Sequence, residues 1–459
     1  MSTDTDTIGA PPPSSLGPLR VCPDNPRYFA DGSGRAVCLT GSHNWSNFKD
    51  MEATDPPAPF DYAAYLDFLV ACHHNFFRLW AWELTCSAQG ADKAVSYRAP
   101  FQWPRTGPGT ASDGRPRFDL SRLDQSYFDR MGARVLAARA RGLYVSVMLF
   151  DGYGPQFNRR PGDGFPFEGG NNINGIACGG PESQSLRDPA VTAVQEAYVR
   201  KVVDTVNDLD NVLYEVANEA GVYSTEWQYH IITFVKQYEA GRPAQHPVGM
   251  TFQYEGGTDQ ALWDSDADWI SPSGSGGFGY PSDPPLADGR KVVINDTDHS
   301  FYYTTMQEAG EAGQRAWAWK SFLRGNCTLF MDPYLLPWPG RNDPRDGQVD
   351  PQWDMLRRNL GYTLRYARKL DLTKAVPSAE FASTGYSLIE PGRASLTYLP
   401  EGGTVTVGLA GGGFDVEWFN PAAGTTHSAP SVVGGAPREL TAPFDGDAVL
   451  FLQTRACAP

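Results

Sequence analysis

The stretch Asn211-Val-Leu-Tyr-Glu-Val-Ala-Asn-Glu-Ala-Gly221 decides the fold. Its β-branched and aromatic residues predict a short buried strand that ends in the polar pair Asn218-Glu219. A helical pattern precedes this strand at 188–210, and another follows it at about 225–240. A strand between two helices with a carboxylate at its C-terminal end is how parallel α/β enzymes present catalytic groups. We therefore expect the rest of the chain to bring further polar groups to the same edge.

Strand and helix patterns alternate from residue 20 to 374, with long loops at 84–118 and 152–187. The predicted strands cover 36–41, 75–83, 143–150, 212–216, 247–255, 268–273, 291–294 and 327–331. Eight strands with intervening helices predict a (β/α)8 TIM barrel over 20–374. After Lys374 the chain changes to short alternating runs separated by Gly and Pro. This change predicts a small β-sandwich domain over 376–457, which we expect to cap the barrel.

Composition narrows the classes of partner. A chain of 459 residues has room for one large domain and a smaller one. Its net charge of −15 argues against binding of a nucleic acid, whose phosphates are also negative, and no apolar run is long enough to span a membrane. The 12 Trp, 21 Tyr and 24 Phe residues suit an enzyme that stacks flat ligands such as sugars. We therefore expect a carbohydrate partner, with no nucleic acid and no membrane.

The N-terminus and the cysteines bear on the compartment. Residues 1–19 lack the basic and apolar regions of a signal peptide and predict a disordered leader. A cytoplasmic protein is expected, and a secreted one whose signal is absent from this sequence is the alternative. Seven cysteines without CxxC spacing favour neither a disulfide framework nor a zinc site.

Polar side chains gather where the barrel strands are predicted to end, and catalytic groups of a barrel come from the ends of several strands. Two carboxylates from opposed strands suit hydrolysis of a glycosidic bond, with one neutral to protonate the leaving oxygen and the other ionised. Glu219 is the candidate acid/base, and Asp296 and Asp298 are candidates for the second carboxylate. We expect no cofactor and no metal. The candidate substrate-binding residues are His43, Trp45, Arg78, Trp80, Asn218, Glu255, His299 and Asp332.

Some of these residues have a more specific expected role. Asn218 supplies an amide for a substrate hydroxyl, and Arg78 keeps an attacking aspartate ionised and oriented. His43 is a candidate for substrate contact or for a structural hydrogen bond. The tryptophans Trp45, Trp80 and Trp82 are candidates for a sugar platform or for core packing.

Several motifs carry a family resemblance. Residues 212–219 resemble the strand-four signature of the retaining (β/α)8 glycoside hydrolases of clan A, in which the Glu after Asn is the acid/base. Phe77-Arg-Leu-Trp80 resembles the strand-two arginine motif of that clan. The motifs Pro104–Gly109, Phe118–Leu120 and Tyr127–Asp129 resemble its cellulase-like members, including the apiosidase-like group. Tyr398-Leu-Pro400 and Trp418-Phe-Asn-Pro421 resemble a C-terminal β-domain of the collagen-binding type.

The sequence departs from the clan at strand seven. The clan nucleophile is a Glu at the tip of that strand, whereas Lys291-Val-Val-Ile-Asn-Asp296 places Asp296 there, followed by Asp298. By the period of two, both aspartates are expected on one face of the strand. The resemblance implies Asp296 as nucleophile and retention of configuration, while the shorter Asp side chain leaves inversion open. The two long loops favour exo action.

Two other functions fit the same barrel. One is a protein that binds carbohydrate without cleaving it, although both Glu219 and the acidic strand-seven tip are present. The other is a metal-dependent hydrolase or isomerase, which the group Asp298, His299 and Tyr302 suggests, although no HExxH-like spacing accompanies it.

Overall fold

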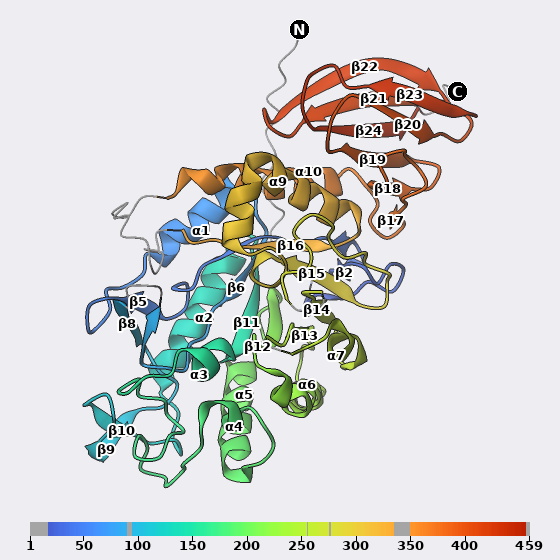
Figure 1. The fold of residues 1–459 in the computed structure, drawn as a ribbon. Coiled ribbons are helices and arrows are strands. Elements are labelled where there is room, and N and C mark those ends of the chain that lie inside the picture. The colour runs from blue at the N-terminus through green and yellow to red at the C-terminus, as the bar shows by residue number, and fades with distance from the viewer. Residues whose placement is uncertain (1–16, 90–93, 255, 275–276, 335–348, 456–459) are drawn as a thin grey trace.

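The computed structural model describes residues 17–89, 94–254, 256–274, 277–334 and 349–455. Within these ranges the chain forms a closed barrel of eight parallel strands surrounded by helices, and antiparallel sheets of its C-terminal part pack beside it (Figure 1). The predicted fold class is therefore confirmed. The predicted leader lies almost wholly outside the described residues. No helix in the described part of the chain is long and apolar enough to cross a membrane.

The barrel strands follow chain order around the barrel, and the last one closes against the first. They are β4 (Thr40–His43), β6 (Phe76–Leu79), β11 (Tyr144–Asp151), β12 (Val212–Asn218), β13 (Val248–Thr251), β14 (Trp269–Ser271), β15 (Val292–Asp296) and β16 (Cys327–Met331). Since all eight run in parallel, their C-terminal ends lie at one end of the barrel.

Long helices cover the outside of the barrel, and shorter ones lie in its connections (Figure 1). The long ones are α1 (Tyr62–Ala71), α2 (Gln125–Arg139), α5 (Pro189–Val206), α6 (Thr225–Glu239), α9 (Tyr303–Leu323) and α10 (Asp354–Ala367). The short ones are α3 (Tyr153–Phe157), α4 (Gly180–Ser183), α7 (Asp259–Asp264), α8 (Thr297–Ser300), and the 3₁₀ turns η1 (Val222–Ser224) and η2 (Pro351–Trp353).

The unit α5–β12 illustrates how the sequence builds the barrel. Asp188 caps α5 by accepting a 2.9 Å hydrogen bond from the N–H of Ala190, and a proline occupies the first turn, where no N–H is needed. All seven residues of β12 are buried, as expected for a strand covered on both faces. Leu213 packs with residues of other barrel strands, including Phe76. Because side chains alternate, Glu215 also faces the barrel interior.

Two predicted segments differ from the structure. The barrel strand expected at 36–41 is β4, while β3 (Ala36–Val37) joins a small sheet with β1 (Arg20–Val21) and β2 (Phe29–Ala30). The segment 84–118, predicted as a loop, contains strands β7 (Cys86–Gln89), β8 (Ala94–Ala99), β9 (Arg105–Thr110) and β10 (Pro116–Phe118). Strand β8 pairs with β5 (Asp50–Glu52), which precedes α1 in the chain. Such long-range pairing leaves no local pattern in a segment rich in Gly and Pro.

The C-terminal part is antiparallel. Its strands are β17 (Val376–Pro377), β18 (Ser387–Glu390), β19 (Ala394–Leu399), β20 (Thr404–Gly408), β21 (Gly413–Asn420), β22 (Thr425–Val433), β23 (Pro437–Thr441) and β24 (Ala448–Thr454). Six of them form one sheet, and β20 pairs with β23 in a second. An apolar cluster that includes Val407, Trp418 and Leu450 is buried here. The six-stranded sheet also packs on the barrel, since Trp319 of α9 stacks on Tyr398 of β19.

Candidate active site

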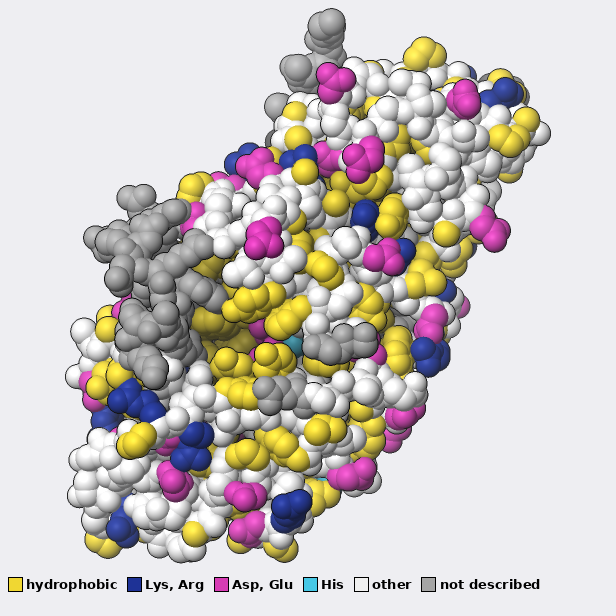
Figure 2. Space-filling model, viewed as in Figure 1, with side chains coloured by type: hydrophobic (Ala, Val, Ile, Leu, Met, Phe, Trp, Pro, Cys, Tyr) yellow, Lys and Arg dark blue, Asp and Glu magenta, His cyan; other side chains and the backbone are white. Residues whose placement is uncertain are grey.

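A cavity of about 890 Å³ opens at the C-terminal ends of the barrel strands. Figure 2 shows a hollow on this face with hydrophobic side chains around it and acidic and histidine side chains inside. The described residues that line the cavity are Trp45, Trp80, Trp82, Ala88, Tyr153, Phe157, Asn158, Arg159, Arg160, Asn218, Glu219, Tyr254, Phe278, Asp298, Tyr302 and Met331. The cavity thus combines two carboxylates with a largely aromatic lining.

Glu219 comes directly after β12 and faces this cavity. Its backbone has a φ of +54°, a left-handed conformation that non-glycine residues rarely adopt and that recurs at functional sites. The neighbouring turn passes close by, since a Cβ at Gly152 would lie 2.2 Å from the carbonyl oxygen of Asn218. Burial, and then the charge of Asp298, raise the pKa of Glu219 well above its ordinary value. The surroundings of Glu219 therefore favour the protonated form of its carboxyl group.

The two aspartates of strand seven lie in different surroundings. Strand β15 ends at Asp296, and Asp298 already belongs to α8. The expectation that both share one face of a strand is therefore wrong, because the chain turns into a helix between them. Asp298 lines the cavity beside Glu219, whereas Asp296 is not among the described residues that line it.

Arg78 is buried beneath the cavity and joins the acidic groups. Its guanidinium donates to both carboxylate oxygens of Glu215, with Nε at 2.8 Å from Oε2. Nη1 lies 2.9 Å from Oδ2 of Asp296 and 3.4 Å from Oδ2 of Asp298. Nη2 donates to Oδ1 of Asn218 at 2.6 Å. One cation is thus shared among three carboxylates and fixes them relative to the end of β12.

This arrangement shifts the pKa values of the two aspartates in opposite directions. The pKa of Asp296 is held well below its ordinary value, because His43 and Arg78 together outweigh the effect of burial. Burial, and then the charge of Asp296, raise the pKa of Asp298 to about 7, while Arg78 opposes the rise. Asp296 is therefore permanently ionised, and Asp298 ionises near neutral pH.

His299 is held in one tautomer. Its Nε2 lies 3.0 Å from Oδ1 of Asn218, and its Nδ1 lies 2.8 Å from Oγ of Ser271. The atom of Asn218 must be the amide oxygen, because Arg78 also donates to it. Nε2 of His299 therefore carries the proton and Nδ1 accepts from the serine hydroxyl. Burial lowers the pKa of His299 to about 3, so the ring is neutral.

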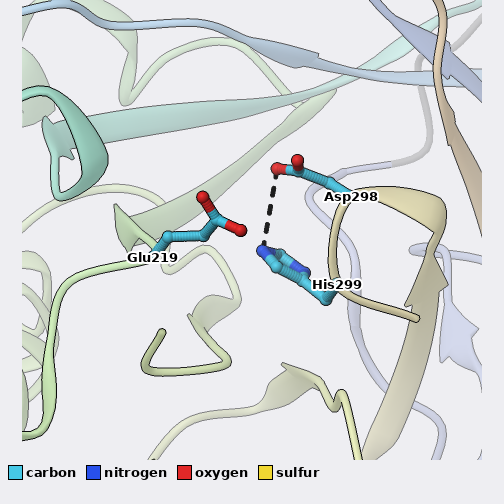
Figure 3. Close-up of side chains that lie close together, drawn as sticks. All are labelled: Glu219, Asp298 and His299. Carbon is cyan, nitrogen blue, oxygen red and sulfur yellow. Dashed lines mark ion pairs between the residues drawn. The ribbon is translucent and has the colours of Figure 1, made fainter. Parts of the chain in front are cut away.

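The side chains of Glu219, Asp298 and His299 lie close together (Figure 3), and one polar atom of each lies within 4.8 Å of the others. The two carboxylates are suitable ligands for a cation. His299 is not, because the proton on Nε2 is donated to Asn218 and leaves this nitrogen no lone pair. The three side chains therefore do not fit a metal centre, and their arrangement suits chemistry carried by the two carboxylates.

The other candidates from the sequence fall into three groups. Trp45 and Trp80 line the cavity, and so does Trp82. His43 stacks on Trp80 with ring centroids 5.2 Å apart, and its Nε2 lies 3.3 Å from Oδ2 of Asp296, so it lies behind the cavity wall. Asp332 pairs with Arg357 of α10 through both carboxylate oxygens and is not among the described lining residues. The predicted substrate-binding residue Glu255 lies outside the described residues.

Sequence reasoning missed most of the aromatic lining. Tyr153 and Phe157 of α3 line the cavity, as do Tyr254, Phe278 and Tyr302 from the connections after β13, β14 and β15. The signal was present, since each lies in a segment that follows a barrel strand. The sequence alone does not distinguish these lining residues from the many aromatic residues that belong to the core.

No known family model matches this sequence, and no curated protein matches it in sequence. Solved structures match its fold along nearly the whole chain. A family 5 glycoside hydrolase from Bacteroides vulgatus has a TM-score of 0.63 at 14% identity, with 96% of this chain and 94% of that one covered. A second structure, named a glycoside hydrolase, has a TM-score of 0.61 at 14% identity, covering 96% of this chain and 98% of that one. The likeness confirms the barrel fold implied by the resemblance; the collagen-binding type of the C-terminal domain stays a prediction.

Proposed function

We propose that this protein is a retaining glycoside hydrolase with Glu219 as acid/base and Asp298 as nucleophile. The observation that carries the proposal is the pairing of these carboxylates in one cavity, with an oxygen of each within 4.8 Å of the other. This upper limit for one pair of oxygens favours the short spacing of retaining enzymes, about 5–5.5 Å between the carboxyl groups, over the roughly 6.5–9.5 Å that leaves room for a water in inverting ones.

The protonation of the pair supports these roles. The pKa of Asp298 is raised to about 7 with Arg78 opposing the rise, whereas burial and the charge of Asp298 raise the pKa of Glu219 well above its ordinary value. We assign the ionised role to Asp298, which Arg78 contacts, and the proton-donating role to Glu219. Two groups whose surroundings push their pKa values apart are the usual acid and nucleophile of a glycosidase.

The reaction follows in two steps. Asp298 attacks the anomeric carbon while Glu219 gives its proton to the leaving oxygen, so the glycosidic bond breaks as a glycosyl ester forms. Glu219, now ionised, then takes a proton from water, which attacks the anomeric carbon and releases Asp298. Arg78 holds Asp298 through Nη1, and Asn218 offers its amide nitrogen to a sugar hydroxyl.

The sequence predicts Asp296 as the nucleophile. We assign it a positioning role instead, because its carboxylate already has three partners. It accepts hydrogen bonds from Arg78 and from the backbone N–H of Asp298, and Nε2 of His43 lies close to it. Exo action remains part of the proposal. Both long loops contribute to the cavity wall, with Ala88 from the first and Tyr153 and residues 157–160 from the second, and such walls favour binding of a chain end.

Aryl glycosides test the proposal. A panel of nitrophenyl glycosides, including pentofuranosides, identifies a substrate for the wild-type protein. Glu219→Gln should then lower kcat on a substrate with a poor leaving group by roughly 10²–10⁴-fold, because proton transfer contributes about that much. The control is Glu226→Gln, which makes the same change at an exposed position of α6. Near-wild-type turnover by Glu219→Gln would contradict the acid/base role.

A further inference from the structure

The cavity has aromatic side chains on two groups of elements. One group is continuous, with ring centroids 5.1 Å apart for Tyr153 and Phe157, and 5.2 Å for Phe157 and Tyr254. The other group contains Trp80 and Trp82, whose centroids are 5.7 Å apart. These faces suit sugar rings, but they do not discriminate a neutral sugar from a charged one.

Two donors in the cavity wall lack an acceptor. Nδ2 of Asn158 and Nη1 of Arg160 are both shielded from solvent and have no hydrogen-bond partner. Both residues line the cavity and lie on the same loop, directly after α3. The Arg160 guanidinium forms no ion pair or hydrogen bond within the described part of the chain. A shielded donor without a partner costs free energy, and the half-buried Arg160 carries one such donor.

The adjacent arginine shows the contrast. Arg159 also lines the cavity, but its Nε donates to Oδ2 of Asp163 at 2.5 Å and its Nη2 to Oε2 of Glu168 at 2.6 Å. The loop therefore neutralises one of its two cations and leaves the other unpaired beside the cavity. Overall electrostatics would not attract an anion, since the chain carries a net charge of −15. Recognition of an anion would have to come from a local cation such as Arg160.

We propose that the cavity takes a carbohydrate that carries an oxyanion, either a uronate carboxylate or a sulfate ester, and that Arg160 and Asn158 hold this group. The inference rests on the proposed function and names the substrate class of that site. A guanidinium suits a carboxylate or sulfate because its parallel N–H groups form two charge-assisted hydrogen bonds. The Asn158 amide supplies a third donor on the same loop.

Binding to matched sugar pairs tests this inference. The Glu219→Gln protein is titrated calorimetrically with oligosaccharides of glucuronic, galacturonic or mannuronic acid and with their carboxyl-reduced forms. Sulfated oligosaccharides and their desulfated forms make the second arm. At least one acidic member should bind about 10- to 100-fold more tightly than its neutral counterpart, because hydrogen bonds to charged groups are the strong ones. The arm that contains it identifies the oxyanion.

Variants locate the contact. Arg160→Gln should abolish the difference between the acidic and neutral partners, whereas Arg160→Lys, which keeps the charge but not the planar fork, should restore part of it. The control is Arg187→Gln, the same change at an exposed position that does not line the cavity. Thermal unfolding verifies that each variant is folded. The comparison of matched pairs in the Glu219→Gln protein, with Arg160 intact, remains decisive if Arg160→Gln does not fold.

The outcomes separate this inference from the proposed function. Glu219-dependent cleavage of neutral glycosides, with no preference for acidic partners, would overturn the inference and leave the function standing. A preference for acidic sugars that Arg160→Gln leaves unchanged would also overturn it. Absence of both binding and cleavage across all sugars would overturn the inference together with the function on which it rests.

Discussion

The carboxylate of Asp296 accepts a 3.0 Å hydrogen bond from the backbone N–H of Asp298. Through this contact Asp296 caps α8, and the chain leaves the extended conformation of β15 between the two residues. The Asp296 carboxylate stays beside Arg78, while that of Asp298 reaches the cavity. The capping hydrogen bond thus marks the point where two similar side chains take different places. Asp296 becomes a buried anion, and Asp298 faces the cavity.

This division predicts which aspartate is replaceable by an external nucleophile. Asp298→Ala should lower turnover by orders of magnitude, since the attacking group is lost and a hole remains beside the anomeric carbon. Sodium azide should restore part of the activity on a substrate with an activated leaving group and yield a glycosyl azide of inverted configuration. Asp296→Ala should also lose activity, but azide should not restore it. Rescue of Asp296→Ala alone would return the nucleophile role to Asp296.

The spacing of the pair predicts retention of configuration. An oxygen of Glu219 lies within 4.8 Å of one of Asp298, which leaves little room for a water between carboxylate and sugar. Proton NMR of the first product, recorded before mutarotation, should show the same anomer as the substrate. An inverted first product would exclude the covalent intermediate and make the ionised aspartate a general base.

The barrel and the place of Glu219 at the end of a strand were predictable because their signals are local. The β-branched and aromatic residues of 212–216 predict a buried strand, and Glu219 directly follows β12 in the structure. The same local signals indicated Arg78 and Asn218, whose contact is now seen at 2.6 Å. Local signals do not reveal which group each polar side chain contacts, because the contacting residues come from strands far apart in the chain.

The strand-seven tip shows where sequence reasoning stops. The period of two holds only while the backbone is extended, and the capping interaction of Asp296 ends β15 at this residue. Sequence reasoning also did not single out the loop residue Arg160 as a candidate binding residue. Its sequence neighbour Arg159 is equally basic, and only the structure shows that Asp163 and Glu168 neutralise one cation and not the other.

The contact between the barrel and the C-terminal sheets predicts a stability effect. Arg315 of α9 donates to both oxygens of Asp447, from Nη2 at 2.7 Å and from Nε at 3.0 and 3.1 Å, and Asp447 is buried. Asp447→Asn should lower the free energy of unfolding by about 3–5 kcal/mol, because it leaves a largely buried guanidinium without its counterion. Differential scanning calorimetry measures this, with Asp445→Asn at an exposed position as the control. An unchanged Tm would mean that this ion pair contributes little to the contact.

The charge of Asp296 predicts how activity depends on pH. Asp298 must be ionised to attack, and its pKa is about 7, so kcat/KM should rise with pH through this range and fall again where Glu219 ionises. After burial, the charge of Asp296 is the largest contribution that raises the pKa of Asp298, with Glu215 adding to it and Arg78 opposing it. Removing that charge stabilises the ionised form of Asp298, so Asp296→Asn should move the acidic limb to lower pH.

The measurement is the pH profile of kcat/KM on an activated aryl glycoside, which keeps the residual rate of Asp296→Asn detectable. The sign of the shift is diagnostic. If the acidic limb moves to lower pH, the titrating group is a nucleophile whose pKa the charge of Asp296 raises, as proposed for Asp298. A limb that stays in place while activity falls would mean that the group titrating near neutral pH does not feel Asp296. Asp266→Asn, which removes an exposed charge away from the cavity, should leave both the limb and the rate unchanged.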